Sequence, residues 1–230
     1  MKTYTAAQVR EAETPFLEAG VPLMARASAA LAAETAALLR QQRGDVAGSR
    51  VLILAGAGNN GGDALHAGAM LAGQGALVTV VPTAAELHET GAAAALAAGV
   101  TVLPFGAPAS GAAELARRSD VILDGILGTG TSANPALRGH ARDVVAAILP
   151  VLGEGGGVPL VIAVDLPSGI GPDDGAVPDP TVLPANVTVT FGGCKTGLVR
   201  EPAAHMVGRI LVADIGIGAE LERIADRDRA

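Results

Sequence analysis

Short apolar runs recur along the chain and alternate with alanine-rich stretches. The runs are continuous rather than interleaved with polar residues, which is typical of strands buried on both faces of a parallel sheet. Most of the stretches between them are long enough for crossover helices. The pattern therefore predicts an α/β fold: a Rossmann-like, doubly wound, mostly parallel sheet flanked by helices. The expected strands are 51–56, 76–81, 100–103, 121–125, 160–165, 187–191 and 209–214.

Two helices are expected before the first strand. Thr5 and Gln8 have the spacing of a capping box, which predicts a helix over about residues 6–19. A second helix should begin near Pro22 and stop at Gly44. No repeat or linker interrupts the pattern, so we expect a single domain over residues 1–230. Its polar end, 219–230, is expected to be either a flexible tail or a frayed helix.

Composition narrows the class of function. The chain has 230 residues, a net charge of −7, no Trp, one Tyr and three Phe. Nucleic-acid surfaces need clustered Lys and Arg with stacking rings, so no nucleic-acid partner is expected. Residues 64–85 lack charged side chains, but glycines and a proline interrupt them. We therefore expect no membrane span there.

Cysteine content and the N-terminus bear on the compartment. Cys194 is the only cysteine, which excludes a disulfide within the chain and fits a reducing environment. The first residues contain no long apolar segment of the kind found in signal peptides. These features predict a cytoplasmic location.

The segment LAGAGNNGGDAL contains the G-x-G-x-x-G spacing of a dinucleotide-binding turn. Because an expected strand precedes it and a helical stretch follows it, we expect an anion-binding helix N-terminus. An ordinary NAD site needs an acid about 20 residues further on, whereas the first acid there is Glu86. Asp63 is expected in the first helical turn, either as a site carboxylate or as a plain helix-start acid. Asn59 and Asn60 either offer amides to a ligand or tolerate a left-handed turn.

Two further expected strands end in an acid. VILDGILGTGTSAN places Asp124 at a strand end, and VIAVDLPSGI places Asp165 and Ser168 at another. In an open α/β sheet, ligands bind outside the carboxyl ends of the strands. Each acid alone could be a cap or a turn residue. Together with Asp63, they indicate one mixed polar site that suits a ligand with phosphate and hydroxyl groups.

The segment TFGGCKTGL adds a lysine to the candidate residues. Lys195 follows an expected strand and two glycines, and it could neutralise a phosphate, donate a proton or simply be exposed. No histidine partner for Cys194 can be identified from the sequence, so this cysteine is expected to be a small buried residue rather than a nucleophile.

The segments GAGNNGGDAL, DGILGTGTSAN, VDLPSG and GGCKTGL resemble, in order and spacing, those of the NAD(P)H-hydrate epimerase family, the YjeF N-terminal domain. The resemblance extends to about residue 218, and the pairing of GNNGGD with VDLPSG makes it specific. Ala64 stands where the family usually has glycine, and Thr196 where proline is common. The resemblance implies interconversion of the R and S hydrates of NADH and NADPH, which carry water across the nicotinamide C5–C6 bond. It also implies a partner NAD(P)H-hydrate dehydratase, fused or separate, a bound potassium ion and a homodimer.

The resemblance also assigns roles to residues. The potassium ligands would be Asn60, Asp124 and Ser168. For the reaction that the resemblance implies, we choose Asp165 as the acid/base that protonates the departing hydroxyl and deprotonates the returning water, with Lys195 as a second choice. As an acid, Asp165 would need a partly apolar pocket. The substrate-contacting positions would be Asn59, Asn60, Gly61, Gly62, Asp63, Gly128, Thr129, Gly130, Thr131, Ser132, Ala133, Asn134 and Asp165.

Two other functions compete with the epimerase. A domain of the same fold could serve as a non-catalytic nucleotide-binding or interaction module, and loss of the polar strand-end residues would indicate it. Because Asp165, Lys195 and the GNNGGD loop are all present, the enzyme is favoured. An ordinary NAD-dependent dehydrogenase is disfavoured by the missing ribose-binding acid. Preference for the hydrate of NADH or that of NADPH stays open.

Overall fold

A parallel sheet forms the centre of the computed structural model, which describes residues 1–130, 134–153 and 159–229. All seven expected strands are present, with bounds within a few residues of the prediction. They are β2 (Arg50–Ala55), β3 (Leu77–Pro82), β4 (Thr101–Val102), β5 (Val121–Gly125), β6 (Leu160–Val164), β7 (Val187–Phe191) and β9 (Arg209–Ala213). Their order across the sheet is β4-β3-β2-β5-β6-β7-β9, and every neighbouring pair is parallel. The doubly wound prediction is confirmed.

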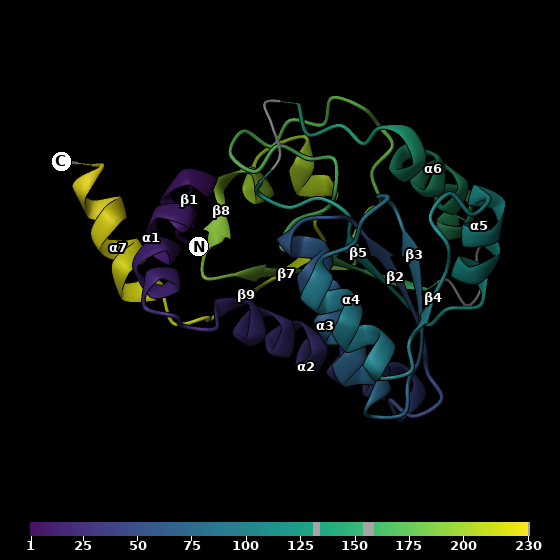
Figure 1. Ribbon diagram of the computed structural model, residues 1–230. Helices are drawn as coiled ribbons and strands as arrows, with labels where there is room; N and C mark the ends of the chain where they lie inside the picture. The colour runs from purple at the N-terminus through teal and green to yellow at the C-terminus, as the bar shows by residue number, and fades with distance from the viewer. Residues whose placement is uncertain (131–133, 154–158, 230) are drawn as a thin grey trace.

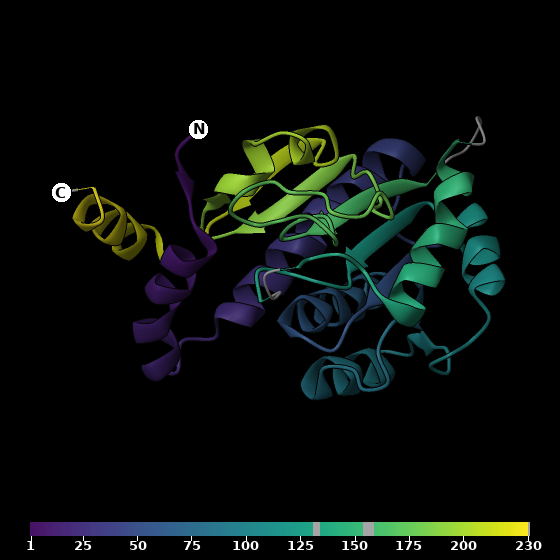
Figure 2. The ribbon, with the colours of Figure 1, turned by 90° about the horizontal axis from the view of Figure 1, so that it is seen from above.

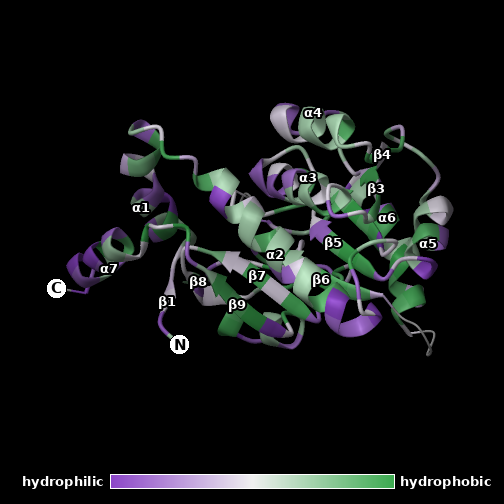
Figure 3. Cartoon of the chain, turned by 90° about the horizontal axis from the view of Figure 1, so that it is seen from below, coloured by the Kyte–Doolittle hydropathy of each residue, from purple (hydrophilic) through white to green (hydrophobic). Residues whose placement is uncertain are grey.

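Helices cover both faces of the sheet (Figure 1). Val51 and Ile53 of β2 pack toward one face and Leu52 and Leu54 toward the other, because successive side chains of a strand alternate. Both sets are fully buried, which explains the continuous apolar runs and the hydrophobic colour of the central strands in Figure 3. The first face carries α2 (Leu23–Arg43) and α3 (Asn59–Ala72), with α4 (Glu89–Ala97) on α3; the second carries α5 (Ala109–Arg117) and α6 (Gly139–Gly153).

The N-terminal helices begin and end as predicted. Helix α1 (Ala6–Glu18) opens with the capping box of Thr5 and Gln8, in which each side chain bonds the other residue's backbone N–H. Helix α2 ends at Gly44, which adopts a left-handed conformation with φ of 86°. A parallel pair, β1 (Thr3–Tyr4) with β8 (Cys194–Lys195), was not predicted, since two-residue strands leave no periodic pattern.

The C-terminal segment, for which we left open a flexible tail or a frayed helix, forms α7 (Gly218–Arg227). Leu221, Ile224 and Ala225 recur at helical spacing and are buried, and the helix packs on α1. Figure 2 shows α1 and α7 together at the end of the molecule away from α5 and α6. Two short 3-10 turns, Thr196–Val199 and Ala203–His205, complete the described elements.

The direction in which the chain adds strands to the sheet reverses between β2 and β5. A ligand crevice is expected at this point. β2 continues outward through β3 and β4, while β5 starts the other half of the sheet. Loops leave such a switch point in opposite directions and open a crevice at the carboxyl ends of the strands. Within the described ranges, no single helix has the length and apolar character to cross a membrane; α1 and α2 meet this test only as a pair bent by 117°.

Candidate active site

A cleft of about 890 Å³ lies at the carboxyl edge of the sheet. Its walls come from the turn after β2, the start of α3, the loop after β5, the ends of β6 and β7, and the helices α1 and α2. The predicted site residues that line it are Asn59, Asn60, Asp63, Gly128, Thr129, Gly130, Asn134, Asp165 and Lys195. Four segments far apart in the sequence therefore meet in one cavity.

The remaining predicted residues fall into three groups. Gly61 and Gly62 are buried inside α3, behind the cleft wall. Asp124 and Ser168 are buried and do not line the cleft. Thr131, Ser132 and Ala133 lie outside the described residues.

The glycine-rich segment is helical from an earlier residue than the sequence suggested. Helix α3 starts at Asn59, with Gly58 as its N-cap, so Asn59 and Asn60 are helical and do not occupy left-handed turn positions. Asp63 lies in the second turn, not the first, and the expectation of a helix-start acid is wrong. The N–H groups of the first turn have no partner within the helix, and they open toward the cleft at Gly58 and Asn59. This end of α3 is suited to an anion.

Asn60 connects the loops after three strands. Its Nδ2 donates to the carbonyl of Leu127, at 2.8 Å, and to that of Val164. Gly128 leaves room for this side chain, because a Cβ there would lie 2.8 Å from the Asn60 amide. The start of α3 is thereby held against the loop after β5 and the end of β6.

Asp124 and Ser168 form a buried pair next to these contacts. The Ser168 hydroxyl donates to Asp124 Oδ1 at 2.6 Å, and the Ser168 N–H donates to Oδ2 at 2.8 Å. The Leu127 N–H donates to the Ser168 hydroxyl at 2.9 Å. Burial raises the pKa of Asp124, partly offset by the hydrogen bonds from Ser168 and Ile126. Asn60 and Ser168 both bond the backbone of Leu127, and Ser168 also bonds Asp124, so one hydrogen-bonded group joins the three predicted potassium ligands.

Asp165 is held in an unusual backbone conformation by a polar network. Its φ is 66°, and it is the one non-glycine residue with positive φ in the described ranges. Its Oδ1 accepts from Lys195 Nζ, from the Thr190 hydroxyl at 3.0 Å and from the Phe191 N–H at 3.1 Å. Strained backbone is kept where the surroundings over-determine it, often at functional sites. The cleft that Asp165 lines is partly apolar, with Ile126, Leu127 and Phe191 in its lining, while an ammonium and two further donors surround its Oδ1.

Lys195 is buried, with 1% of its surface exposed, so the alternative of an exposed lysine is wrong. Its Nζ also donates to the Phe191 carbonyl at 2.9 Å and to the Thr190 hydroxyl at 3.1 Å. An ammonium with these three acceptors is a fixed electrostatic partner of Asp165. Cys194, beside it, is buried as expected, and burial raises the pKa of its thiol, which disfavours a nucleophilic role.

Helices α1 and α2 add residues that the sequence analysis missed. Glu13 and Arg10 of α1 line the cleft, and Arg10 donates to the Thr129 carbonyl at 2.9 Å. The Ser28 hydroxyl of α2 lies 3.2 Å from Asp63 Oδ1 and 2.7 Å from the Met24 carbonyl, and these two acceptors compete for its single proton. These helices precede the sheet in sequence, and no local motif marks them as site-forming. The sequence predicted that these two helices form, from their caps and periodicity, but not that they line the site.

Burial in the cleft wall strongly raises the pKa of Asp63. Desolvation raises its pKa from the usual 3.8 to about 8, opposed by the Ser28 hydrogen bond and reinforced by the charges of Asp165 and Glu13. Burial likewise raises the pKa of Glu13. The cleft therefore contains two acids with raised pKa values, a property that suits a general acid.

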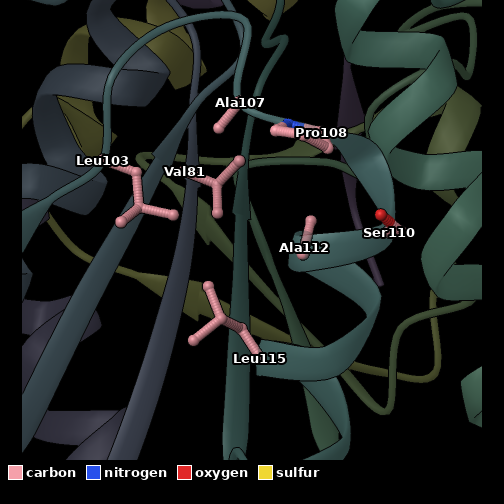
Figure 4. A pocket seen from close by; sticks show the side chains of 8 residues that line it. Val81, Leu103, Ala107, Pro108, Ser110, Ala112 and Leu115 are labelled. Carbon is pink, nitrogen blue, oxygen red and sulfur yellow. The ribbon is translucent and has the colours of Figure 1, made fainter.

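A second, smaller hollow of about 390 Å³ lies between β3 and α5 (Figure 4). Its lining is mainly apolar, and among the described residues Ser110 is the one side chain there with a hydrogen-bonding group. None of the described residues that line it is ionisable, so they offer no group for acid/base chemistry. The chemistry of the described residues points to the larger cleft. The hollow is lined by Val81, Leu103, Ala107, Pro108, Ser110, Gly111, Ala112 and Leu115.

Comparison with known proteins identifies the family of the chain. The family model described as "YjeF-related protein N-terminus" matches residues 21–197, which include every predicted site residue. The chain is 52% identical to the NAD(P)H-hydrate epimerase of Clavibacter michiganensis subsp. michiganensis, over 93% of this chain and 90% of that one. The chain belongs to the NAD(P)H-hydrate epimerase family.

Other family members show two chain organisations. The NAD(P)H-hydrate epimerase of Microbacterium testaceum is 45% identical, over 96% of this chain and 80% of its own length. A protein of Mycobacterium tuberculosis named bifunctional NAD(P)H-hydrate repair enzyme Nnr is 35% identical, and the match covers 93% of this chain but 41% of that protein. The crystal structure of the yeast protein YNL200c has the same fold, with a TM-score of 0.72 and 22% identity over 92% of this chain and 87% of that one.

Proposed function

We propose that the chain is an NAD(P)H-hydrate epimerase, an isomerase that interconverts the R and S epimers of hydrated NADH and NADPH. The observation that carries the proposal is the single cleft in which the start of α3, Asp165 and Lys195 meet. The 52% identity to a protein of that name, over nearly the whole chain, supports it. The non-catalytic alternative is disfavoured because Asp63, Asp165 and Lys195 all line the cleft.

Substrate binding would use the backbone more than side-chain charge. The free N–H groups at the start of α3 suit the pyrophosphate, and Arg10 and Arg138 add positive charge at the cleft. Gly56 allows the turn to lie against the next loop, because a Cβ there would overlap the Ile126 carbonyl. Gly128, Thr129, Gly130 and Asn134 would contact the nucleotide, as would Asn59 and Asp63.

The reaction needs one bond to be broken and remade at C6. The C6 hydroxyl departs with help from the electron pair of the ring nitrogen, and water returns to the other face of the ring. Asp165 is suited to take the proton of that water, because its three hydrogen bonds from described residues all reach Oδ1 and leave Oδ2 available. Lys195 positions this carboxylate and balances its charge.

The donor atoms around Asp124 fit a potassium ion. Asp124 is a buried carboxylate, and among the described residues its hydrogen-bond partners are all uncharged. Asn60, Asp124 and Ser168 would hold the ion with one carboxylate, one amide and one hydroxyl. That low-charge oxygen set suits a monovalent cation better than Mg²⁺ or Ca²⁺. Bound there, potassium would supply positive charge and hold three strand-end loops together.

Two partners follow from the same proposal. An S-specific NAD(P)H-hydrate dehydratase would consume the product, and the bifunctional relatives support such a pairing.

A homodimer would form through the N-terminal helices, where Leu17 is 57% exposed. Sedimentation velocity at several concentrations tests the dimer.

The decisive experiment mixes the R hydrate of NADH with an S-specific dehydratase, with and without the chain. We expect NADH to be recovered much faster when the chain is present. An unchanged rate would leave the non-catalytic module as the better description. A parallel assay for hydride transfer from NADH should be negative, and a positive result would favour the dehydrogenase instead.

A further inference from the structure

We propose that Asp63 is a second proton-carrying group of the cleft: it gives the proton to the departing C6 hydroxyl, while Asp165 accepts the proton of the returning water. The inference rests on the proposed epimerase function and deepens it. Acid and base become two different carboxyl groups, from α3 and from the end of β6. Asp63 is then more than a residue that contacts the substrate.

The geometry distinguishes the two carboxyl groups. Asp63 lines the cleft, is 7% exposed, and among the described residues its carboxyl accepts one hydrogen bond, from Ser28. Asp165 lines the same cleft but accepts three, one of them from the ammonium of Lys195. Two carboxyl groups with such different hydrogen-bond partners in one cavity are suited to separate acid and base roles.

The charged groups that face Asp63 favour its neutral form. Asp165 from the end of β6 and Glu13 from α1 oppose a further negative charge, and Lys195 from β8 partly offsets them. The facing group from α2 is the uncharged Ser28. Burial is the largest contribution and brings the pKa of Asp63 to about 8. At neutral pH, this group therefore carries a proton that it can donate.

The reaction balances with these two groups. The Asp63 proton moves to the C6 hydroxyl, the C6–O bond breaks, and the ring-nitrogen electron pair forms the C6–N1 double bond as water leaves. A water then attacks C6 from the other face, the double-bond electrons return to N1, and the proton of that water passes to Asp165. Solvent transfers a proton from Asp165 to Asp63 and restores the starting state, with no net oxidation.

The first test compares the wild type with Asp63→Asn, which keeps the size of the side chain and its ability to accept from Ser28. We expect kcat for epimerisation to fall by about 100-fold or more, with KM little changed, as for loss of a general acid. The wild-type rate should decline above pH 8 as Asp63 loses its proton, and this alkaline decline should be absent from the residual activity of the variant. Asp143→Asn, on the exposed side of α6, is the matched control and should behave as wild type.

A second variant tests the assignment without removing the acid. In Ser28→Ala the hydrogen bond that lowers the pKa of Asp63 is lost, so the alkaline decline should move to higher pH. A purely structural role for Asp63 would leave the position of the decline unchanged. Thermal unfolding of each variant shows whether it is folded.

Carboxyl ¹³C NMR titration of the wild type, with Asp63→Asn to assign the signal, gives a readout without activity. A midpoint near pH 8 supports the inference, and a midpoint near the ordinary value for aspartate overturns it. An active Asp63→Asn variant with wild-type kcat and an unchanged alkaline decline also overturns it, as does a change in KM alone. If the wild type shows no epimerisation, the proposed function fails, and the titration still reports the state of Asp63.

Discussion

Three buried aspartates, each with different neighbours, determine the chemistry at the scale of single residues. Asp124 is bonded to Ser168 away from the cleft, Asp165 is paired with Lys195, and Asp63 is supported by one hydroxyl. The sequence placed all three near strand ends, and the resemblance assigned Asp124 to potassium, Asp165 to acid/base chemistry and Asp63 to substrate contact, but neither showed their partners. Their partners differ: Asp165 has an ammonium, Asp63 has one hydroxyl and a burial that favours its neutral form, and Asp124 has only uncharged donors among the described residues.

Replacing Asp165 with Asn should abolish exchange of the R and S hydrates and also reduce stability. Asn tolerates the left-handed backbone, but buried Lys195 would lose its carboxylate partner, at a cost of about 3–5 kcal/mol. Adding Lys195→Met should recover much of this stability without recovering activity. Denaturant unfolding and the coupled assay measure the two effects, and near-normal exchange in Asp165→Asn would remove this residue from the mechanism.

The raised pKa of Asp63 predicts how stability depends on pH. The unfolded chain releases this proton near pH 3.8, whereas the folded protein keeps it until about pH 8. The stabilising contribution is fully present below pH 3.8 and is lost as the pH rises toward 8, with a slope of up to about 1.4 kcal/mol per pH unit. Asp63→Asn should remove that slope, so that wild type and variant differ most at pH 8. Urea unfolding between pH 5 and 8 measures it, and parallel curves would contradict the shift.

Among the elements, the start of α3 differs most from its prediction. A run of glycines usually indicates a loop, so the helix was expected to begin near Asp63. In the structure Gly61 and Gly62 are helical. Both lack a side chain because α3 lies too close to neighbouring segments to leave room for a Cβ. A Cβ on Gly61 would overlap the Gly56 carbonyl, and one on Gly62 would lie 2.8 Å from the His88 ring. Close packing, not flexibility, explains these two residues.

Gly61→Ala should therefore destabilise the protein clearly more than Gly58→Ala. Helix propensity alone would favour alanine at position 61 by about 1 kcal/mol, but overlap with backbone atoms should outweigh it and cost about 1–3 kcal/mol or more. A Cβ added at Gly58 would meet no heavy atom of the described residues within 4 Å, and the φ of −84° there is ordinary, so this loss should be below about 1 kcal/mol. Thermal unfolding of both variants tests the contrast, and equal losses would contradict the packing argument.

For the whole molecule, the sheet brings the loops together and the N-terminal helices complete the cleft. The ends of β2, β5 and β6 are neighbours in the parallel sheet, and Asn60 bonds across all three loops. Helices α1 and α2 then cover the open side with Glu13, Arg10 and Ser28. The cleft is a property of the assembled fold.

A potassium ion bound by Asn60, Asp124 and Ser168 should stabilise this assembly. At about tenfold its dissociation constant, it would add about 1.4 kcal/mol and raise Tm by about 3–6 °C. Choline at the same ionic strength should give no such rise, and Asp124→Asn should lose the potassium response. Differential scanning calorimetry in the two salts tests this; equal Tm values for the wild type would argue against the ion.

The sequence by itself determined the seven strands, the helices before them and the presence of polar residues at several strand ends. These follow from local periodicity, capping and the rule that parallel strands end at one edge. Only the tertiary structure decided that Lys195 is buried against Asp165, that Ser28 and Glu13 reach Asp63, and that α3 begins at Asn59. The physical reason is that burial and charge environment depend on segments that meet after folding, and the spacing along the chain does not encode those distances.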